Sequence, residues 1–216
     1  MPRTWSVCIR ALVGLAAAGL TAPATGQAQA RTQITPFFAT FFAPLPYAKD
    51  VDQDGAGTLA DERMTTAPGI GIRAAFPFAD QIGFEAQAAY VFTGRQAKVD
   101  AGTGTVGFFI TGNAVIVSGR VTYHPRRSNF RGILGAAFEQ LGGDAWDSDN
   151  VGGEADKSSI GGIVGFGVRA NVTSRLALDL TVESFLHSSD PAGNNKKQFQ
   201  ADVLLSVGVP IGLAGH

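Results

Sequence analysis

The residues with the clearest potential for catalysis lie near the C-terminal end of the sequence. His187 is followed by Ser188 and Ser189, and Asp202 comes in the next apolar segment. A histidine can accept the proton of a serine hydroxyl while a carboxylate orients its ring, so His187, Ser189 and Asp202 are candidates for an acyl-transfer site. The same pattern is typical of a strand-end histidine that runs into a serine-rich turn. We expect the second arrangement, and therefore no enzyme, and keep acyl transfer as the alternative.

A second candidate is a cation site in the polar stretch 43–66. Asp50, Asp52 and Asp54 alternate before a glycine, and Asp61 stands at the twelfth position counted from Asp50. Alternating carboxylates that end in a late carboxylate are typical of calcium loops. Gly57 at the eighth position departs from the usual apolar residue. A solvated acidic loop is the simpler interpretation, and a loop that binds Ca²⁺ is the alternative. We expect no other cofactor.

Nine charged residues fall within apolar segments rather than in the polar stretches between them. None of the nine is a lysine, and arginines and carboxylates are nearly balanced. Forked arginine donors suit a crowded interior in which every ion must be paired. We therefore predict an interior salt-bridge network of Arg73, Glu85, Arg120, Arg131, Glu139, Arg169, Asp179, Glu183 and Asp202.

The elements that position these residues have the two-residue period of β-strands. In one example Phe84 and Tyr90 share one face while Glu85 and Gln87 share the other. Only the first segment is ambiguous, because its phenylalanines fall on both faces. The eight predicted strands cover 32–42, 67–78, 83–95, 107–124, 130–141, 159–172, 175–187 and 198–211.

The connections between these strands alternate regularly between long polar stretches and tight turns. The long stretches are 43–66, 96–106, 142–158 and 188–197, and the other three connections are short. This order is typical of an antiparallel up-and-down barrel in a membrane, with short turns at one end and longer loops at the other. Because lipid offers no water to backbone groups, such a sheet must be closed. The predicted fold class is therefore an all-β, eight-stranded transmembrane β-barrel.

The first thirty residues have a different character. Arg3 and Arg10 precede the apolar run 11–20, and the segment ends with an A-x-A site at Ala28 and Ala30. This combination predicts a cleavable signal peptide over 1–30, too short in its apolar part to span a bilayer as a helix. Residues 31–216 then form one barrel domain.

Composition excludes several classes of protein. Charged residues make up 16% of the chain, with 17 Lys and Arg against 18 Asp and Glu, so a basic surface for nucleic acid is excluded. A single cysteine excludes a disulfide scaffold and a cysteine-ligated metal site. We expect outer-membrane lipid and lipopolysaccharide as partners, no nucleic acid, and a monomer.

The signal peptide, the eight alternating segments, the three short turns and the charged interior resemble the small OmpA/OmpX-type outer-membrane barrels. That resemblance implies a bacterial outer-membrane location and a role in envelope structure or surface interaction. The trio His187, Ser189 and Asp202 also loosely resembles the lipid A deacylase barrels, which use an H-x-S pair and an acid. That resemblance implies an esterase at the outer leaflet.

An eight-stranded barrel has room inside for side chains or for one small ligand. Nine interior charges should fill it, so we expect a plugged barrel. A narrow channel for small solutes, in a porin-like membrane protein, is the alternative. In the loops, the acidic stretches 43–66 and 142–158 could bind divalent cations that bridge to lipopolysaccharide phosphates, and Lys196 and Lys197 could contact such phosphates directly.

Overall fold

The computed structural model of the chain describes residues 32–46, 48–52, 59–100, 105–147, 156–173, 176–190 and 197–212. Within these ranges the side chains of 48–52, 59–62, 97–100, 105–106 and 108 are not described. The predicted signal peptide 1–30 therefore lies outside the described residues. No helix among the described residues is long and apolar enough to cross a membrane.

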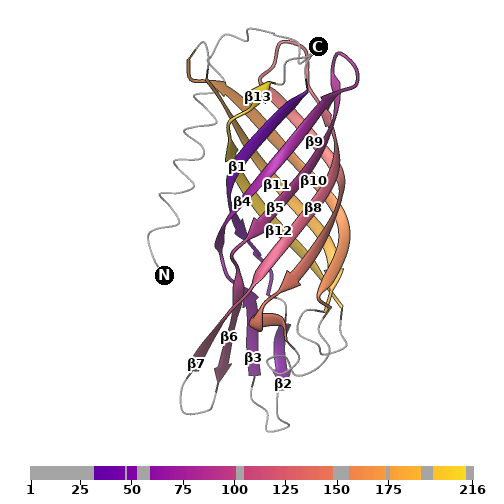
Figure 1. Cartoon of the computed structure of the whole chain (residues 1–216). Coiled ribbons are helices and arrows are strands. Elements are labelled where there is room, and N and C mark those ends of the chain that lie inside the picture. The colour runs from indigo at the N-terminus through magenta and orange to yellow at the C-terminus, as the bar shows by residue number, and fades with distance from the viewer. Residues whose placement is uncertain are drawn as a thin grey trace.

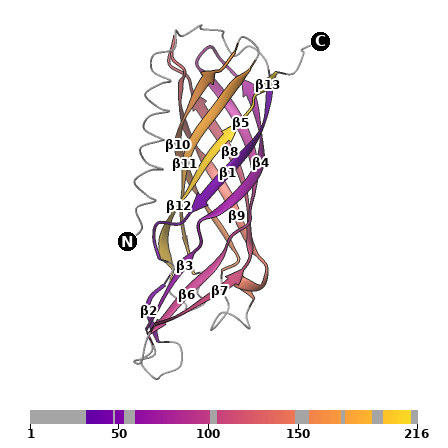
Figure 2. The ribbon, with the colours of Figure 1, turned by 90° about the vertical axis from the view of Figure 1, so that its left-hand side faces the viewer.

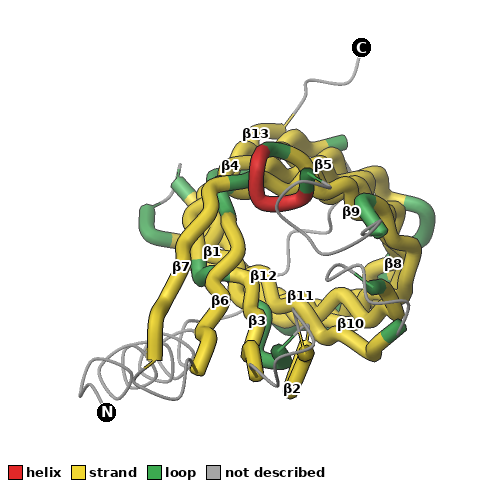
Figure 3. The backbone as a smooth tube through the Cα atoms, turned by 90° about the horizontal axis from the view of Figure 1, so that it is seen from below, coloured by secondary structure: helices red, strands yellow, loops and turns green. Residues whose placement is uncertain are grey.

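Eight antiparallel strands form the closed barrel that the sequence predicts (Figure 1). Each strand pairs with its neighbours in chain order, and β12 pairs with β1 to close the ring. Seen along its axis, the ring of strands is continuous (Figure 3). The barrel strands are β1 (Gln33–Phe42), β4 (Ala67–Pro77), β5 (Ile82–Val91), β8 (Asn113–Tyr123), β9 (Phe130–Gly142), β10 (Ser158–Asn171), β11 (Ala177–Ser189) and β12 (Gln198–Gly208).

The two ends of the barrel differ, and we call them the turn end and the loop end. At the turn end, tight connections join β4 to β5, β8 to β9 and β10 to β11. The β8–β9 turn contains Arg127, which has a positive φ of 60°. The short strand β13 (Ile211–Gly212) also lies at the turn end, where it pairs with the beginning of β1. The longer connections all lie at the loop end.

A second sheet of four strands projects from the loop end (Figures 1 and 2). Its strands are β2 (Ala48–Asp52), β3 (Leu59–Met64), β6 (Gly94–Asp100) and β7 (Thr105–Thr111), in the order β2-β3-β6-β7. The expectation that 43–66 and 96–106 are irregular loops was therefore wrong. The segments predicted as single strands over 83–95 and 107–124 are each divided, at 92–93 and at Gly112. The alternating pattern misses β2, β3 and β6 because polar residues make up half or more of each of these strands.

The predicted alternation is present in all eight barrel strands. Charged and small polar side chains point inward and are buried, whereas large apolar side chains of the same strands are exposed on the outside. The ambiguous first strand follows the same rule. Phe37 and Phe41 are buried inside, and Phe38 is 72% exposed outside. Both faces of β1 are therefore apolar, but the inner face is buried in the barrel and the outer face is exposed.

The outside of the barrel carries a belt of exposed apolar side chains on seven of the eight strands, and on β11 the outward apolar side chains are half-buried. Aromatic residues are prominent near the turn end, where the rings of Phe76 and Phe84 lie 6.5 Å apart and Phe78 and Tyr123 are exposed. Exposing such an apolar surface to water is unfavourable, whereas contact with the hydrocarbon chains of lipid is not. The outer face is therefore suited to a lipid bilayer.

The inside of the barrel is layered along its axis. On β11, Glu183, Phe185 and His187 follow one another on the inner face, and on β12 Leu204 separates Ser206 from Asp202. Phe185 and Leu204 belong to a buried apolar cluster with residues of most other strands. This apolar layer separates polar side chains near the turn end from a second polar group near the loop end.

Trp146 lies in the 3₁₀ turn η1 (Asp144–Trp146) at the loop end. It is 1% exposed and belongs to the buried apolar cluster, and the turn lies at the rim of the barrel (Figure 3). Trp146 is therefore not an exposed loop-tip residue available for membrane or partner contact. Its burial fits local packing of the loop.

Candidate functional site

Seven of the nine predicted interior charges meet in one group near the turn end, which we call the arginine network. Each of its carboxylates contacts at least two guanidinium groups. Glu85 lies 2.9 Å from Arg120 Nη2 and 3.7 Å from Arg131 Nε. Asp179 lies 2.7 Å from Arg131 Nη1, and Glu183 forms an ion pair with Arg120. The members are Arg73, Arg120, Arg131, Arg169, Glu85, Asp179 and Glu183.

Arg73 occupies the centre of this network. Its side chain is 1% exposed and lies 3.8 Å from a carboxylate oxygen of each of the three acids. The guanidinium also donates to Gln87 Oε1 and Ser206 Oγ, and it lies 5.2 Å from the centre of the Phe37 ring. A buried guanidinium is stable only when its donors are satisfied, and this arrangement satisfies them from several strands.

The network extends across the whole width of the barrel. Gln87 Nε2 on β5 donates to Glu183 Oε2 on β11 at 3.0 Å. In the closed order of eight strands, β5 and β11 are four strands apart in either direction, so this bond joins opposite walls. Both side chains are buried.

Glycines on the inner faces make room for these long side chains. A Cβ at Gly167 of β10 would lie 2.9 Å from Arg131 Nε and 3.0 Å from its Cζ. Gly162 on the outer face of the same strand has no heavy atom closer than 4.0 Å to such a Cβ. The predicted polar face of β10 therefore gives the neighbouring arginine its space.

The two remaining predicted charges, Glu139 and Asp202, form a separate group near the loop end with His187. His187 Nε2 lies 2.8 Å from Asp202 Oδ2 and 3.8 Å from Glu139 Oε2. All three side chains are 1% exposed. The sequence gives no sign of this division, because it depends on the register of β9, β11 and β12.

Of the predicted acyl-transfer trio, the structure brings together His187 and Asp202. Ser189 lies on the same inner face of β11 and is buried, but no hydrogen bond joins it to His187 among the described residues. The imidazole of His187 faces the interior of the barrel, whereas a lipid substrate would lie against the outer face. The observed partners of His187 are thus two carboxylates.

The other described histidine, His124, lies at the turn end. Burial lowers the pKa of its imidazole, and the positive charge of Arg131 lowers it further. The turn that follows carries Arg126 and Arg127. The two histidines therefore lie at opposite ends of the barrel interior.

The predicted loop sites are described only in part. Asp54 lies outside the described residues, as do the side chains of Asp50, Asp52 and Asp61, so the calcium site stays a prediction. Lys196 is also outside. Lys197 Nζ lies 3.5 Å from Asp156, and Lys157 Nζ lies 3.1 Å from Asp147.

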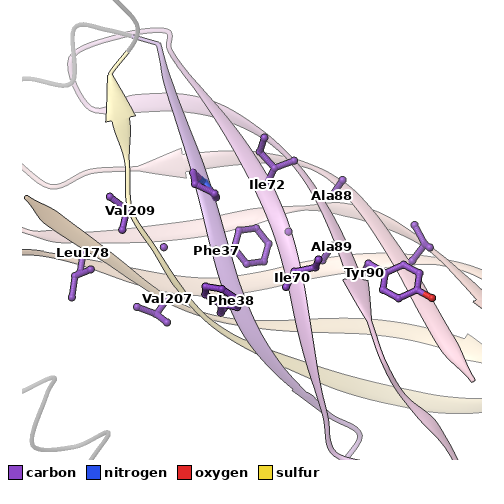
Figure 4. A pocket seen from close by; sticks show the side chains of 14 residues that line it. Phe37, Phe38, Ile70, Ile72, Ala88, Ala89, Tyr90, Leu178, Val207 and Val209 are labelled. Carbon is purple, nitrogen blue, oxygen red and sulfur yellow. The ribbon is translucent and has the colours of Figure 1, made fainter. Parts of the chain in front are cut away.

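An apolar pocket of about 760 Å³ lies in the wall around the junction of β1 and β12. Figure 4 shows that side chains of β1, β4, β5 and β12 surround it, among them Phe38, Ile70, Ile72 and Val207. Pro36, which lacks a backbone N–H, and Gly71 and Gly208, which lack side chains, also line it. The pocket continues the lipid-facing surface, and the Tyr90 hydroxyl is the single polar side-chain group among its lining residues.

The fold has a counterpart among solved structures. The chain is similar to the crystal structure of the outer membrane protein OprG from Pseudomonas aeruginosa, with a TM-score of 0.52 and 17% sequence identity. The match covers 85% of this chain and 97% of that chain. No protein-family model and no curated protein sequence matches the chain.

This likeness concerns the fold alone, and the narrower OmpA/OmpX-type resemblance stays a prediction. The closed antiparallel barrel and its apolar outer belt are those of a small bacterial outer-membrane β-barrel.

Proposed function

We propose that this protein is a plugged outer-membrane barrel that does not conduct solutes and that serves envelope structure or surface interaction through its loop end. The observation that supports the plug most strongly is the hydrogen bond of Gln87 to Glu183, between opposite walls of the barrel. Around it, four arginines and three acids fill the interior with paired charges. A solute would have to break several buried ion pairs to pass, and each broken pair leaves an uncompensated charge.

The loop end supports the second part of the proposal. The sheet of β2, β3, β6 and β7 projects beyond the barrel (Figure 2). Because its strands are joined by backbone hydrogen bonds, this sheet is a firmer platform for contacts than an irregular loop. In an outer-membrane barrel the longer connections face the outside of the cell.

Planar-bilayer recording tests the plug directly. The full chain, folded in detergent and reconstituted, should show no steady conductance. The variant Gln87→Ser/Glu183→Ser removes the bond across the barrel and should raise the frequency of open events. A matched control, Ala88→Ser/Ser184→Ala, changes the outward neighbours of the same two strands and should stay silent. A reproducible open state of the unaltered protein would favour the channel alternative.

The loop end is tested in cells. A strain that lacks the protein should lose envelope integrity, measured as detergent sensitivity, and the full chain should restore it. A chain in which a short glycine turn replaces residues 95–110 keeps the barrel strands. Failure of this shortened chain to restore integrity would support a role for the projecting sheet, whereas full restoration would assign the role to the barrel alone.

A further inference from the structure

Three side chains with metal-ligating atoms meet inside the barrel near the loop end. Glu139 comes from β9, His187 from β11 and Asp202 from β12. One ligand atom of each lies within 4.8 Å of the others. We propose that Glu139, His187 and Asp202 bind one divalent transition-metal ion. This proposal does not depend on whether the barrel conducts solutes.

The charge of this group points to a missing cation. Two carboxylates are buried together, and among the described residues the only cationic partner within ion-pair distance of either is His187. In the arginine network, by contrast, each carboxylate contacts at least two arginines. Burying an unbalanced charge is costly, and a divalent ion would balance both carboxylates at once.

The group also holds polar atoms without a hydrogen-bond partner. They include Glu139 Oε1, Asp202 Oδ1 and His187 Nδ1. Gln200 is an independent observation, because its side chain is 0% exposed and both of its amide atoms lack a partner. Gln200 faces inward and stands directly opposite His187 in the β11–β12 register. Buried polar atoms in native proteins are nearly always paired, so these atoms indicate a bound ligand. The side-chain carbonyl oxygen of Gln200, Oε1, is suited to be the fourth ligand of a metal ion.

The surroundings hold the ligands in place, as expected around a metal. Ser159 Oγ donates to Glu139 Oε2 at 3.2 Å. The ring of Phe185 stacks on the imidazole of His187, with centroids 4.4 Å apart and an angle of 13° between the planes. Such contacts fix the orientation of ligating side chains. The apolar layer beneath, which includes Leu204, closes the site on the side of the arginine network.

The donor set selects the class of ion. An imidazole nitrogen with two carboxylates and an amide oxygen suits Zn²⁺, Co²⁺, Fe²⁺ or Mn²⁺. Ca²⁺ prefers an all-oxygen shell of six to eight ligands, which this group does not provide. The proposed site is therefore chemically distinct from the calcium loop predicted over Asp50–Asp61.

Zinc titration tests the site. The full chain is produced without a polyhistidine tag, folded in detergent, freed of metal with a chelator and dialysed. We expect it to bind one Zn²⁺ per chain inside the barrel, by equilibrium dialysis with elemental analysis. His187→Ala should weaken Zn²⁺ binding at least about 100-fold, and Asp202→Asn and Glu139→Gln about 10- to 100-fold each. Co²⁺ in place of Zn²⁺ should give visible d–d absorption that His187→Ala removes.

Two matched controls separate this site from others. His124→Ala alters the histidine at the opposite end, and Asp52→Ala alters the acidic loop, so both should bind Zn²⁺ within about twofold of the unaltered chain. Asp202→Asn preserves side-chain shape, and heat-modifiable gel mobility shows whether each variant is folded. The proposal is overturned if the chain binds no stoichiometric Zn²⁺, if folded His187→Ala and Asp202→Asn bind it unchanged, or if Asp52→Ala alone abolishes binding.

Discussion

The arginine network and the group around His187 differ in how their buried carboxylates are compensated by cationic side chains. In the network four arginines surround three carboxylates, and the ions are paired from strand to strand. In the second group two carboxylates share one histidine, and several buried polar atoms have no partner. Arg120 Nε and Arg131 Nε also lack a hydrogen-bond partner, but every carboxylate of the network contacts at least two arginines, and such a set of paired ions fits a structural plug. An incomplete set fits a place where a ligand supplies the missing charge.

The largest expected effect is a contrast between identical substitutions in the two regions. Asp179→Asn removes the carboxylate that contacts Arg73, Arg131 and Arg169. Leaving buried arginines without their partner should lower the free energy of unfolding by about 3–5 kcal/mol. Asp202→Asn in the metal-free chain should change it by at most about 1 kcal/mol, because the hydrogen bond that is lost is offset by relief of repulsion from Glu139.

Reversible urea unfolding of the barrel in lipid vesicles measures both values. Trp146 is a suitable reporter, because the only other tryptophan, Trp5, lies in the predicted signal peptide. An equal decrease in the free energy of unfolding for the two variants would mean that both carboxylates depend equally on cationic partners within the protein, contrary to the comparison above.

The next effect sharpens the comparison by adding metal. Zn²⁺ at about 100 times its dissociation constant should raise the free energy of unfolding of the metal-free chain by about 2.7 kcal/mol, because the ion binds only the folded state. Asp202→Asn should lose most of this increment, whereas His124→Ala should keep it. The same unfolding experiment, repeated with chelator and with Zn²⁺, measures the difference. An equal increment in all three proteins would place the stabilising ion elsewhere.

A smaller effect concerns the space that the network needs. A methyl group at Gly167 would displace the Arg131 guanidinium, which Asp179 and Thr181 hold at 2.7 and 3.0 Å. Gly167→Ala should therefore destabilise the barrel by about 1–3 kcal/mol. Gly162→Ala, on the outer face of the same strand, should stay within about 0.5 kcal/mol of the unaltered protein. A cost at Gly162 equal to that at Gly167 would assign the effect to the strand backbone rather than to the crowded interior.

The sequence predicts the barrel well because the two faces of each strand meet different surroundings, lipid and a polar interior. That contrast produces the two-residue period, and it identifies Arg73 or Glu183 as interior residues. Three strands of the projecting sheet, β2, β3 and β6, are missed because polar residues make up half or more of each and leave no such contrast, whereas the apolar β7 falls largely within the predicted strand 107–124. The separation of Glu139 and Asp202 from the arginines is also missed, since it depends on strand register. Glu139 stands opposite Ser159, and His187 opposite Gln200, and no local pattern in the sequence encodes these pairings.

The smallest expected effect is at the water-exposed rim, where ion pairs should contribute least. Lys157 Nζ lies 3.1 Å from Asp147, but the two side chains are 47% and 58% exposed. Solvent screens such a pair, so Lys157→Ala should lower the free energy of unfolding by less than about 1 kcal/mol, and less still at high salt. The backbone carbonyl of Lys157, which accepts from Leu141 N at 2.7 Å, is unaffected by this change. A larger loss that salt does not reduce would show that this rim pair behaves like the buried network, and exposure would then not be what separates strong ion pairs from weak ones in this barrel.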